Sequence, residues 1–90
     1  MHVKYFATFR DLAGERSREV DDGLADVAAL LEVLSVRYGT AFRAAVFDHE
    51  ELSPLMILLV NGRNVRLTGG LATPLAAHDE VSVFPMVAGG

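Results

Sequence analysis

The residues best suited to chemistry in this sequence are the two glycines that end it, Gly89 and Gly90. A glycine has no Cβ atom, so it adopts backbone conformations closed to other residues and passes through channels too narrow for a side chain. The last six residues, 85–90, would span about 20 Å when extended. We therefore expect a slim C-terminal tail that can carry its carboxylate into the active site of a partner protein.

The chemistry expected at Gly90 begins with activation of that carboxylate. A free α-carboxylate has a pKa of about 3.3–3.7, so at neutral pH it is ionised and a poor electrophile. Adenylation at the expense of ATP, by a partner enzyme, would give an acyl-adenylate with a good leaving group. Sulfide would convert the acyl-adenylate to a terminal thiocarboxylate, which suits a chain without cysteine. A lysine amine would instead join the chain to another protein.

Other signatures of catalysis are missing from the sequence. It contains no glycine-rich phosphate loop, zinc-protease motif or nucleophile-elbow motif. His2, His49 and His78 are far apart in the sequence, which favours solvated histidines over a metal site. The adjacent acidic pairs flank predicted turns, where they lack the burial that general acid–base catalysis needs. We expect no bound metal or cofactor, and no enzymatic activity for the chain alone.

Composition excludes further classes of function. The absence of cysteine excludes a disulfide framework and a thiolate metal site. A net charge of −4 and the lack of a basic run argue against nucleic acid as a partner. The longest apolar run covers residues 55–60, whereas a membrane span needs about 20 residues. The first residues also lack the layout of a secretion signal, so we expect a cytoplasmic protein without a membrane partner.

The tail must be held by the rest of the chain, a body that we place at residues 1–84. Alternating apolar residues predict a first strand from His2 to Phe9. A helical turn closed by Gly14 should follow, and then a second strand over 16–20. In this phase Phe6 lies on the polar side of the first strand.

The middle of the chain predicts two helices. Apolar residues recur every three or four positions from Leu24 to Tyr38, which predicts the main helix, and Gly39 stands where helices commonly end. Thr40 is expected to cap a short helix over 41–46.

The second half of the chain predicts mainly strands. The apolar run 55–60 is typical of a central strand covered on both faces, with Met56, Leu58 and Leu59 in the core. A turn at 61–62 should lead into a short strand over 64–67, and the last strand should cover 81–84. Phe84 falls on its polar side.

This order of elements predicts an α+β domain of the β-grasp type. We expect a mixed sheet of four to five strands, one main helix and short helical turns. If the first and last strands are neighbours, Phe6 and Phe84 lie side by side next to the tail, where contiguous apolar surface commonly marks a partner site.

Three segments and the terminal pair carry a resemblance to a known family. The segments are Tyr5–Gly14, Val60–Arg63 and Asp79–Pro85, followed by 87–90. Together they resemble the ubiquitin-like sulfur carriers of the MoaD/ThiS type, and most of all the small subunits of molybdopterin synthase.

The resemblance implies a mechanism and its residues. An ATP-dependent adenylating enzyme would prepare a thiocarboxylate on Gly90, and the large subunit of molybdopterin synthase would receive the tail in a heterotetramer, in molybdenum or tungsten cofactor biosynthesis. Phe6 and Phe84 match aromatic residues of an apolar docking patch. The residues expected to contact partners are Phe6, Phe84, Pro85, Met86, Val87, Ala88 and Gly89.

The sequence also allows other uses of the Gly90 carboxylate. Residues 69–74 are similar to those of carriers that supply sulfur for cysteine synthesis, and tRNA thiolation is a further possible use of the sulfur. The chain could also be a ubiquitin-like modifier joined through Gly90 to lysines, or an interaction module that never uses its carboxylate.

Overall fold

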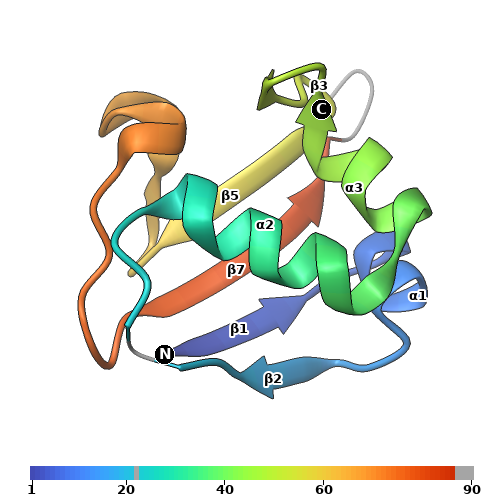
Figure 1. Cartoon of the computed structure of the whole chain (residues 1–90), viewed down its shortest axis with the longest axis horizontal. Coiled ribbons are helices and arrows are strands. Elements are labelled where there is room, and N and C mark those ends of the chain that lie inside the picture. The colour runs from blue at the N-terminus through green and yellow to red at the C-terminus, as the bar shows by residue number, and fades with distance from the viewer. Residues whose placement is uncertain (22, 87–90) are drawn as a thin grey trace.

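A computed structural model describes residues 1–21 and 23–86, and its centre is a five-stranded sheet in the order β2-β1-β7-β5-β6. The strands are β1 (His2–Tyr5), β2 (Ser17–Glu19), β5 (Met56–Val60), β6 (Arg63–Asn64) and β7 (Glu80–Pro85). The β1 and β7 strands pair in parallel, and the other pairs are antiparallel. Helix α2 (Val27–Tyr38) crosses one face of the sheet (Figure 1). The predicted α+β β-grasp fold is confirmed.

The first strand is shorter than predicted. β1 ends at Tyr5, and the chain turns at Ala7, whose φ is 52°, into helix α1 (Thr8–Ala13). Phe9, predicted on the strand, is buried in this helix instead. Gly14 ends α1 in the left-handed conformation, as predicted, because glycine adopts φ 73° without steric cost.

The main helix begins three residues later than predicted. Asp26 caps α2 by accepting a hydrogen bond of 2.9 Å from the Ala29 N–H. Gly39 both ends α2 and precedes α3 (Thr40–Val46), with φ 101°. The prediction that Thr40 caps the short helix is wrong, since Thr40 is its first residue and no side-chain hydrogen bond caps this end.

Residues 56–60 of the apolar run form strand β5, but the prediction of a central strand covered on both faces is wrong. The central strand is β7, and α2 covers only one face of the sheet. In β5, Met56 and Leu58 are buried beneath the helices, as predicted, whereas Leu59 is only half-buried on the opposite face. An apolar run therefore indicates a strand here, but not how many of its faces are covered.

The connections hold short elements. The polar stretch before β5 contains a hairpin of β3 (Phe47–Asp48) and β4 (Glu51–Leu52). After β6 the chain forms one 3₁₀ turn at Val65–Leu67, where a strand was predicted, and another at Gly70–Ala72. Asn64 favours the first turn because its side chain accepts a hydrogen bond of 3.0 Å from the Arg66 N–H.

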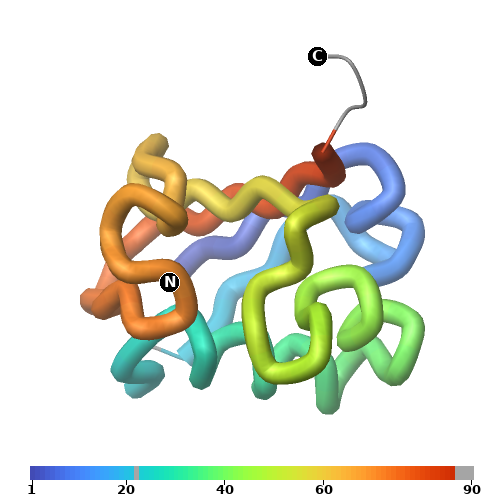
Figure 2. Tube along the Cα trace, turned by 90° about the horizontal axis from the view of Figure 1, so that it is seen from above, coloured from blue at the N-terminus to red at the C-terminus, as the bar shows by residue number. Residues whose placement is uncertain are grey.

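The hydrophobic core lies between the sheet and the helices on one side. Figure 2 shows α2 and α3 together on that side. The large buried side chains include Val3, Tyr5, Leu30, Leu31, Leu34, Phe42, Met56, Leu58, Val81 and Val83. We call this side of the sheet the covered face and the opposite side the open face.

Candidate docking surface at the end of β7

Two aromatic side chains meet on the open face. Val3 and Tyr5 of β1 point into the core, so Phe6, directly after the strand, lies on the other side. Its N–H donates a hydrogen bond of 3.0 Å to the Val83 carbonyl, which extends the pairing of β1 with β7 by one residue. This places Phe6 beside Phe84.

Phe6 and Phe84 stack on each other. Their ring centroids are 4.4 Å apart, their planes differ by 8°, and both side chains are half-buried. Ile57 of β5 pairs in register with Phe84 and is half-buried on the same face. The prediction that the two outward aromatics are neighbours is confirmed, whereas their role in docking stays a prediction.

Apolar surface continues to the point where β7 ends. Pro85, the last residue of β7, pairs with Met56, and the Met86 N–H donates a hydrogen bond of 2.8 Å to the Leu55 carbonyl. Leu55 is 70% exposed and Met86 is 46% exposed. We define the docking patch as Phe6, Leu55, Ile57, Phe84 and Met86.

Sequence reasoning missed Leu55 and Ile57. Both belong to a continuous apolar run, which on its own does not show which residues face away from the helices. The register between β5 and β7 supplies that information, because it aligns Ile57 with Phe84.

The remaining predicted site residues, Val87, Ala88, Gly89 and Gly90, lie outside the described part of the chain. What the structure gives is their point of attachment, which is the end of β7 beside the docking patch.

Charged residues share the open face at its other end. Lys4, the single lysine of the sequence, forms an ion pair of 2.5 Å with Glu80, and both side chains are partly exposed. This contact holds the pKa of the Glu80 carboxyl below its ordinary value. His2 lies beside Glu19 on the same face. The open face is thus charged near the start of β1 and apolar near the end of β7.

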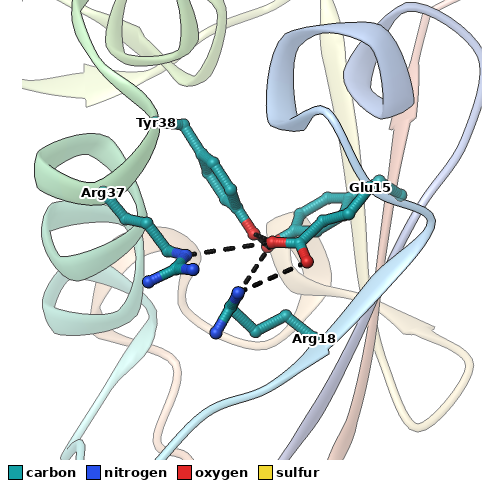
Figure 3. Close-up of polar contacts among 5 residues, drawn as sticks. Glu15, Arg18, Arg37 and Tyr38 are labelled. Carbon is teal, nitrogen blue, oxygen red and sulfur yellow. Dashed lines mark hydrogen bonds and ion pairs between the residues drawn. The ribbon is translucent and has the colours of Figure 1, made fainter.

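A polar cluster lies at the rim of the covered face (Figure 3). The Tyr5 hydroxyl donates to the Tyr38 hydroxyl at 3.0 Å, and Tyr38 donates in turn to Glu15 at 2.5 Å. Arg18 Nε donates to the same Glu15 carboxylate at 2.8 Å, and Arg37 Nε lies 3.8 Å from it. The cluster ties α2 to β1 and to the chain before β2.

Each pKa shift in this cluster has a physical cause. The Arg18 hydrogen bond, and then the one from Tyr38, lower the pKa of the Glu15 carboxyl because both favour its charged form. Burial raises the pKa of Tyr5 and of Tyr38, and the hydrogen bond between Tyr38 and Glu15 adds to the rise for Tyr38. The tyrosines therefore stay neutral donors.

Over residues 1–21 and 23–86, no cluster of three or more His, Cys, Asp or Glu side chains could hold a metal ion. Within the same ranges, every helix is too short or too polar to cross a bilayer.

A sequence profile of the ThiS family matches residues 3–90, nearly the whole chain. The chain belongs to the ThiS family. This ThiS-family protein is similar to small archaeal modifier protein 3 of Haloferax volcanii, with 42% identity over 93 aligned residues that cover 100% of this chain and 98% of the relative.

Two further relatives of this ThiS-family protein extend the comparison. A provisionally named sulfur carrier protein of Archaeoglobus fulgidus is 42% identical over 72 residues, which cover 80% of this chain and 82% of the relative. The Amycolatopsis orientalis BexX/CysO complex holds a chain of the same fold, with a TM-score of 0.83 and 28% identity over 99% of this chain and 98% of that one.

Proposed function

We propose that this ThiS-family protein is a ubiquitin-like carrier that is not an enzyme itself and whose chemistry takes place at the Gly90 carboxylate. A partner enzyme would bind the docking patch, receive the tail and adenylate Gly90 with ATP. The activated carbonyl would then accept sulfide, as in a sulfur carrier, or a lysine amine, as in a protein modifier. The two outcomes share every step up to the acyl-adenylate.

The proposed reaction needs no side chain from the rest of this chain. A Gly90 carboxylate oxygen attacks the α-phosphorus of ATP, and pyrophosphate leaves. Hydrosulfide attacks the acyl carbon, AMP leaves, and a thiocarboxylate remains. In the modifier route an amine attacks the same carbon, loses a proton and forms an isopeptide bond as AMP leaves. The partner enzyme supplies the catalytic groups, and this chain supplies the substrate.

The observation that carries the proposal is the apolar docking patch at the point where β7 ends. A stacked aromatic pair beside exposed Leu55 and Met86 is the kind of surface that partners bury. Its place at the base of the tail would let one enzyme bind the body and the C-terminus together. Docking of the body would raise the effective concentration of Gly90 at the active site.

The relatives support both outcomes for this chain. One is named as a modifier and the other as a sulfur carrier, and each aligns with most of its own length. The BexX/CysO complex supports the idea that a chain of this fold binds a partner protein.

Activation at Gly90 is tested with the full chain, its cognate adenylating enzyme, ATP and a sulfide donor. We expect the intact mass to rise by one sulfur-for-oxygen exchange located at Gly90. A control chain with one alanine added after Gly90 should show no exchange. No exchange in the unmodified chain, or equal exchange in both chains, would overturn the proposal.

The modifier route needs a variant, because the last tryptic site in the sequence is Arg66. Trypsin would leave the whole segment 67–90 on a target lysine, which is hard to detect. Ala88→Arg shortens this remnant to Gly89-Gly90, so modified lysines in cell digests become visible by mass spectrometry. The same variant without Gly90 is the control. Remnants that require Gly90 would support the modifier route. Their absence would leave the sulfur route as the function if Ala88→Arg still shows the sulfur exchange at Gly90, because Ala88 is itself expected to contact partners.

The narrowest form of the proposal names molybdopterin synthase as the receiver. It rests on the likeness of Tyr5–Gly14, Val60–Arg63, Asp79–Pro85 and 87–90 to small subunits of that enzyme. Its test is co-purification with a large synthase subunit as a heterotetramer from the cytoplasm, where we expect the chain to act. Co-purification with a cysteine synthase or a tRNA-thiolating enzyme instead would assign the chain to cysteine synthesis or to tRNA thiolation.

A further inference from the structure

Among the strands that the structure describes, none pairs with the outer edge of β2. In the sheet order, β2 has β1 on one side and no described strand on the other. Met1 and Val20 exchange two backbone hydrogen bonds, of 3.1 and 2.9 Å, and Tyr5 donates to Arg16 at 2.9 Å. Because backbone groups alternate in direction along a strand, the N–H and C=O groups of Ser17 and Glu19 point away from β1.

A groove runs between this edge and α2 on the covered face. Its volume is about 310 Å³. Its floor and walls include the apolar side chains of Val20, Leu24, Val33 and Leu34. Val33, on the side of α2 that lines this groove, is 43% exposed. The groove thus offers apolar surface directly beside free backbone donors and acceptors.

Two arginines stand at one end of the groove. Arg18 and Arg37 both line it, and their side chains are 31% and 50% exposed. Arg18 donates a hydrogen bond to the Glu15 carboxylate and Arg37 lies 3.8 Å from it, as Figure 3 shows. Glu15 together with Arg18 and Arg37 carries one net positive charge, and the other charged residues that line the groove are the acidic Glu19 and Asp21. This end of the groove therefore favours an acidic group.

We propose that β2 and this groove bind an extended peptide segment of a partner protein, which adds to the sheet as a sixth strand. The backbone of the peptide would bond to the outward groups of Ser17 and Glu19. Strand addition of this kind takes affinity from the main chain and specificity from alternate side chains. The strands β1 and β7 separate this site from β5. The proposal therefore does not depend on Gly90 or on the docking patch.

The register dictates what the peptide should contain. Arg18 pairs with the inward-facing Val3 in β1, so Arg18 and Val20, two residues apart, both face the groove side of the sheet. A peptide strand should therefore place an acidic side chain opposite Arg18 and an aliphatic one opposite Val20, also two residues apart. An antiparallel strand would read aliphatic-x-acidic, and a parallel strand acidic-x-aliphatic.

The backbone gives a direct test by hydrogen exchange, followed by NMR on the full-length chain. The probe is the acetylated and amidated peptide Gly-Ser-Val-Thr-Val-Ser-Glu-Ser, together with its reversed sequence. We expect the Ser17 and Glu19 amides to exchange at least tenfold more slowly with peptide bound. The Arg18 amide, which faces β1, should exchange slowly in both states and serves as the internal control.

Matched surface variants test the side chains. Val33→Asp should weaken peptide binding at least tenfold, while Val36→Asp, on the same helix but 82% exposed and outside the groove, should not. Arg37→Ala should weaken binding of the acidic peptide but not of a version with glutamine for glutamate, with Arg43→Ala as its control. Adenylation of Gly90 should be unchanged in Val33→Asp, which separates this proposal from the proposed function.

Three results would overturn the proposal. One is no change in exchange at Ser17 and Glu19 with either peptide at millimolar concentration. Another is protection located on the docking patch instead of β2. The third is protection of β2 without peptide together with a dimeric mass in sedimentation, which would assign this edge to a second copy of the chain.

Discussion

The two faces of the sheet are made by the same strands and yet have opposite properties. Along β7, Val81 and Val83 are fully buried under the helices, whereas Ser82 and Phe84 remain half-exposed. Along β5, Leu58 is buried and its neighbour Ile57 is not. The covered face holds the apolar contacts that stabilise the fold. The open face carries apolar side chains that contribute less to folding and are free to contact a partner.

Substitutions of neighbouring residues on one strand test this contrast most directly. The largest change in the free energy of unfolding is expected in β5. Leu58→Ala removes a buried side chain and leaves a cavity, so it should lower the free energy of unfolding by about 3 kcal/mol. For a domain of this size, that is a fall in Tm of roughly 12–24 °C.

Ile57→Ala is the matched control for Leu58→Ala. We expect a loss of about 1 kcal/mol, because Ile57 is half-exposed on the open face. Urea or thermal unfolding followed by circular dichroism measures both variants. Equal losses would show that the open face is as much a part of the core as the covered face.

Phe84→Ala should give the next largest effect, on binding more than on folding. Loss of the stack with Phe6 should lower kcat/KM for adenylation of Gly90 about tenfold, which corresponds to about 1.4 kcal/mol. The measurement is pyrophosphate release at low carrier concentration. Leu67→Ala, an 85% exposed residue outside the docking patch, is the control. A large fall in Tm with unchanged kcat/KM would place Phe84 in the core rather than at an interface.

The smallest effect on stability should come from replacing Glu15, whose charged side chain lies at the rim of the otherwise apolar covered face. Its folded pKa is lowered by Arg18 and Tyr38 from the ordinary 4.5, so its charged form stabilises the fold. This stability is fully present well above pH 4.5 and is lost as the pH falls through the lower, folded pKa.

Glu15→Gln should therefore unfold more easily than the unmodified chain at pH 7. The difference should shrink below pH 4.5, where the unfolded carboxyl is protonated. Urea unfolding at a series of pH values measures this, with Glu51→Gln as a control that carries the same change of charge. A difference that is constant from pH 7 to pH 3 would contradict the assignment.

The sequence alone predicted the features that depend on local patterns. Alternation in the first and last strands placed Phe6 and Phe84 on one face, and Gly14 and Gly39 end α1 and α2 because those positions need positive φ. The ThiS match confirmed the resemblance to the ThiS type of sulfur carrier, whereas the particular likeness to molybdopterin synthase small subunits stays a prediction. The strand phases and the helix ends were predictable because each depends on residues close together in the chain, and the contact of Phe6 with Phe84 was predicted on the condition that their strands are neighbours.

Features that depend on distant residues were not predicted. Glu15 and Tyr38 are 23 positions apart, and nothing in either stretch indicates that they meet. The open side of β5 was missed for the same reason, since an apolar run gives no information on what covers it. The edge of β2 becomes visible only when the strand order is known.

The parallel pairing of β1 with β7 has a mechanical consequence. The chain enters β1 at one end of the sheet and leaves β7 at the opposite end, and the two strands lie side by side from His2 to Tyr5. A force that stretches the body between its two ends acts along these strands, so the hydrogen bonds between them bear the load together in shear. Such a force cannot separate β1 from β7 by breaking their hydrogen bonds one at a time. We therefore expect the body to resist extension between its two ends.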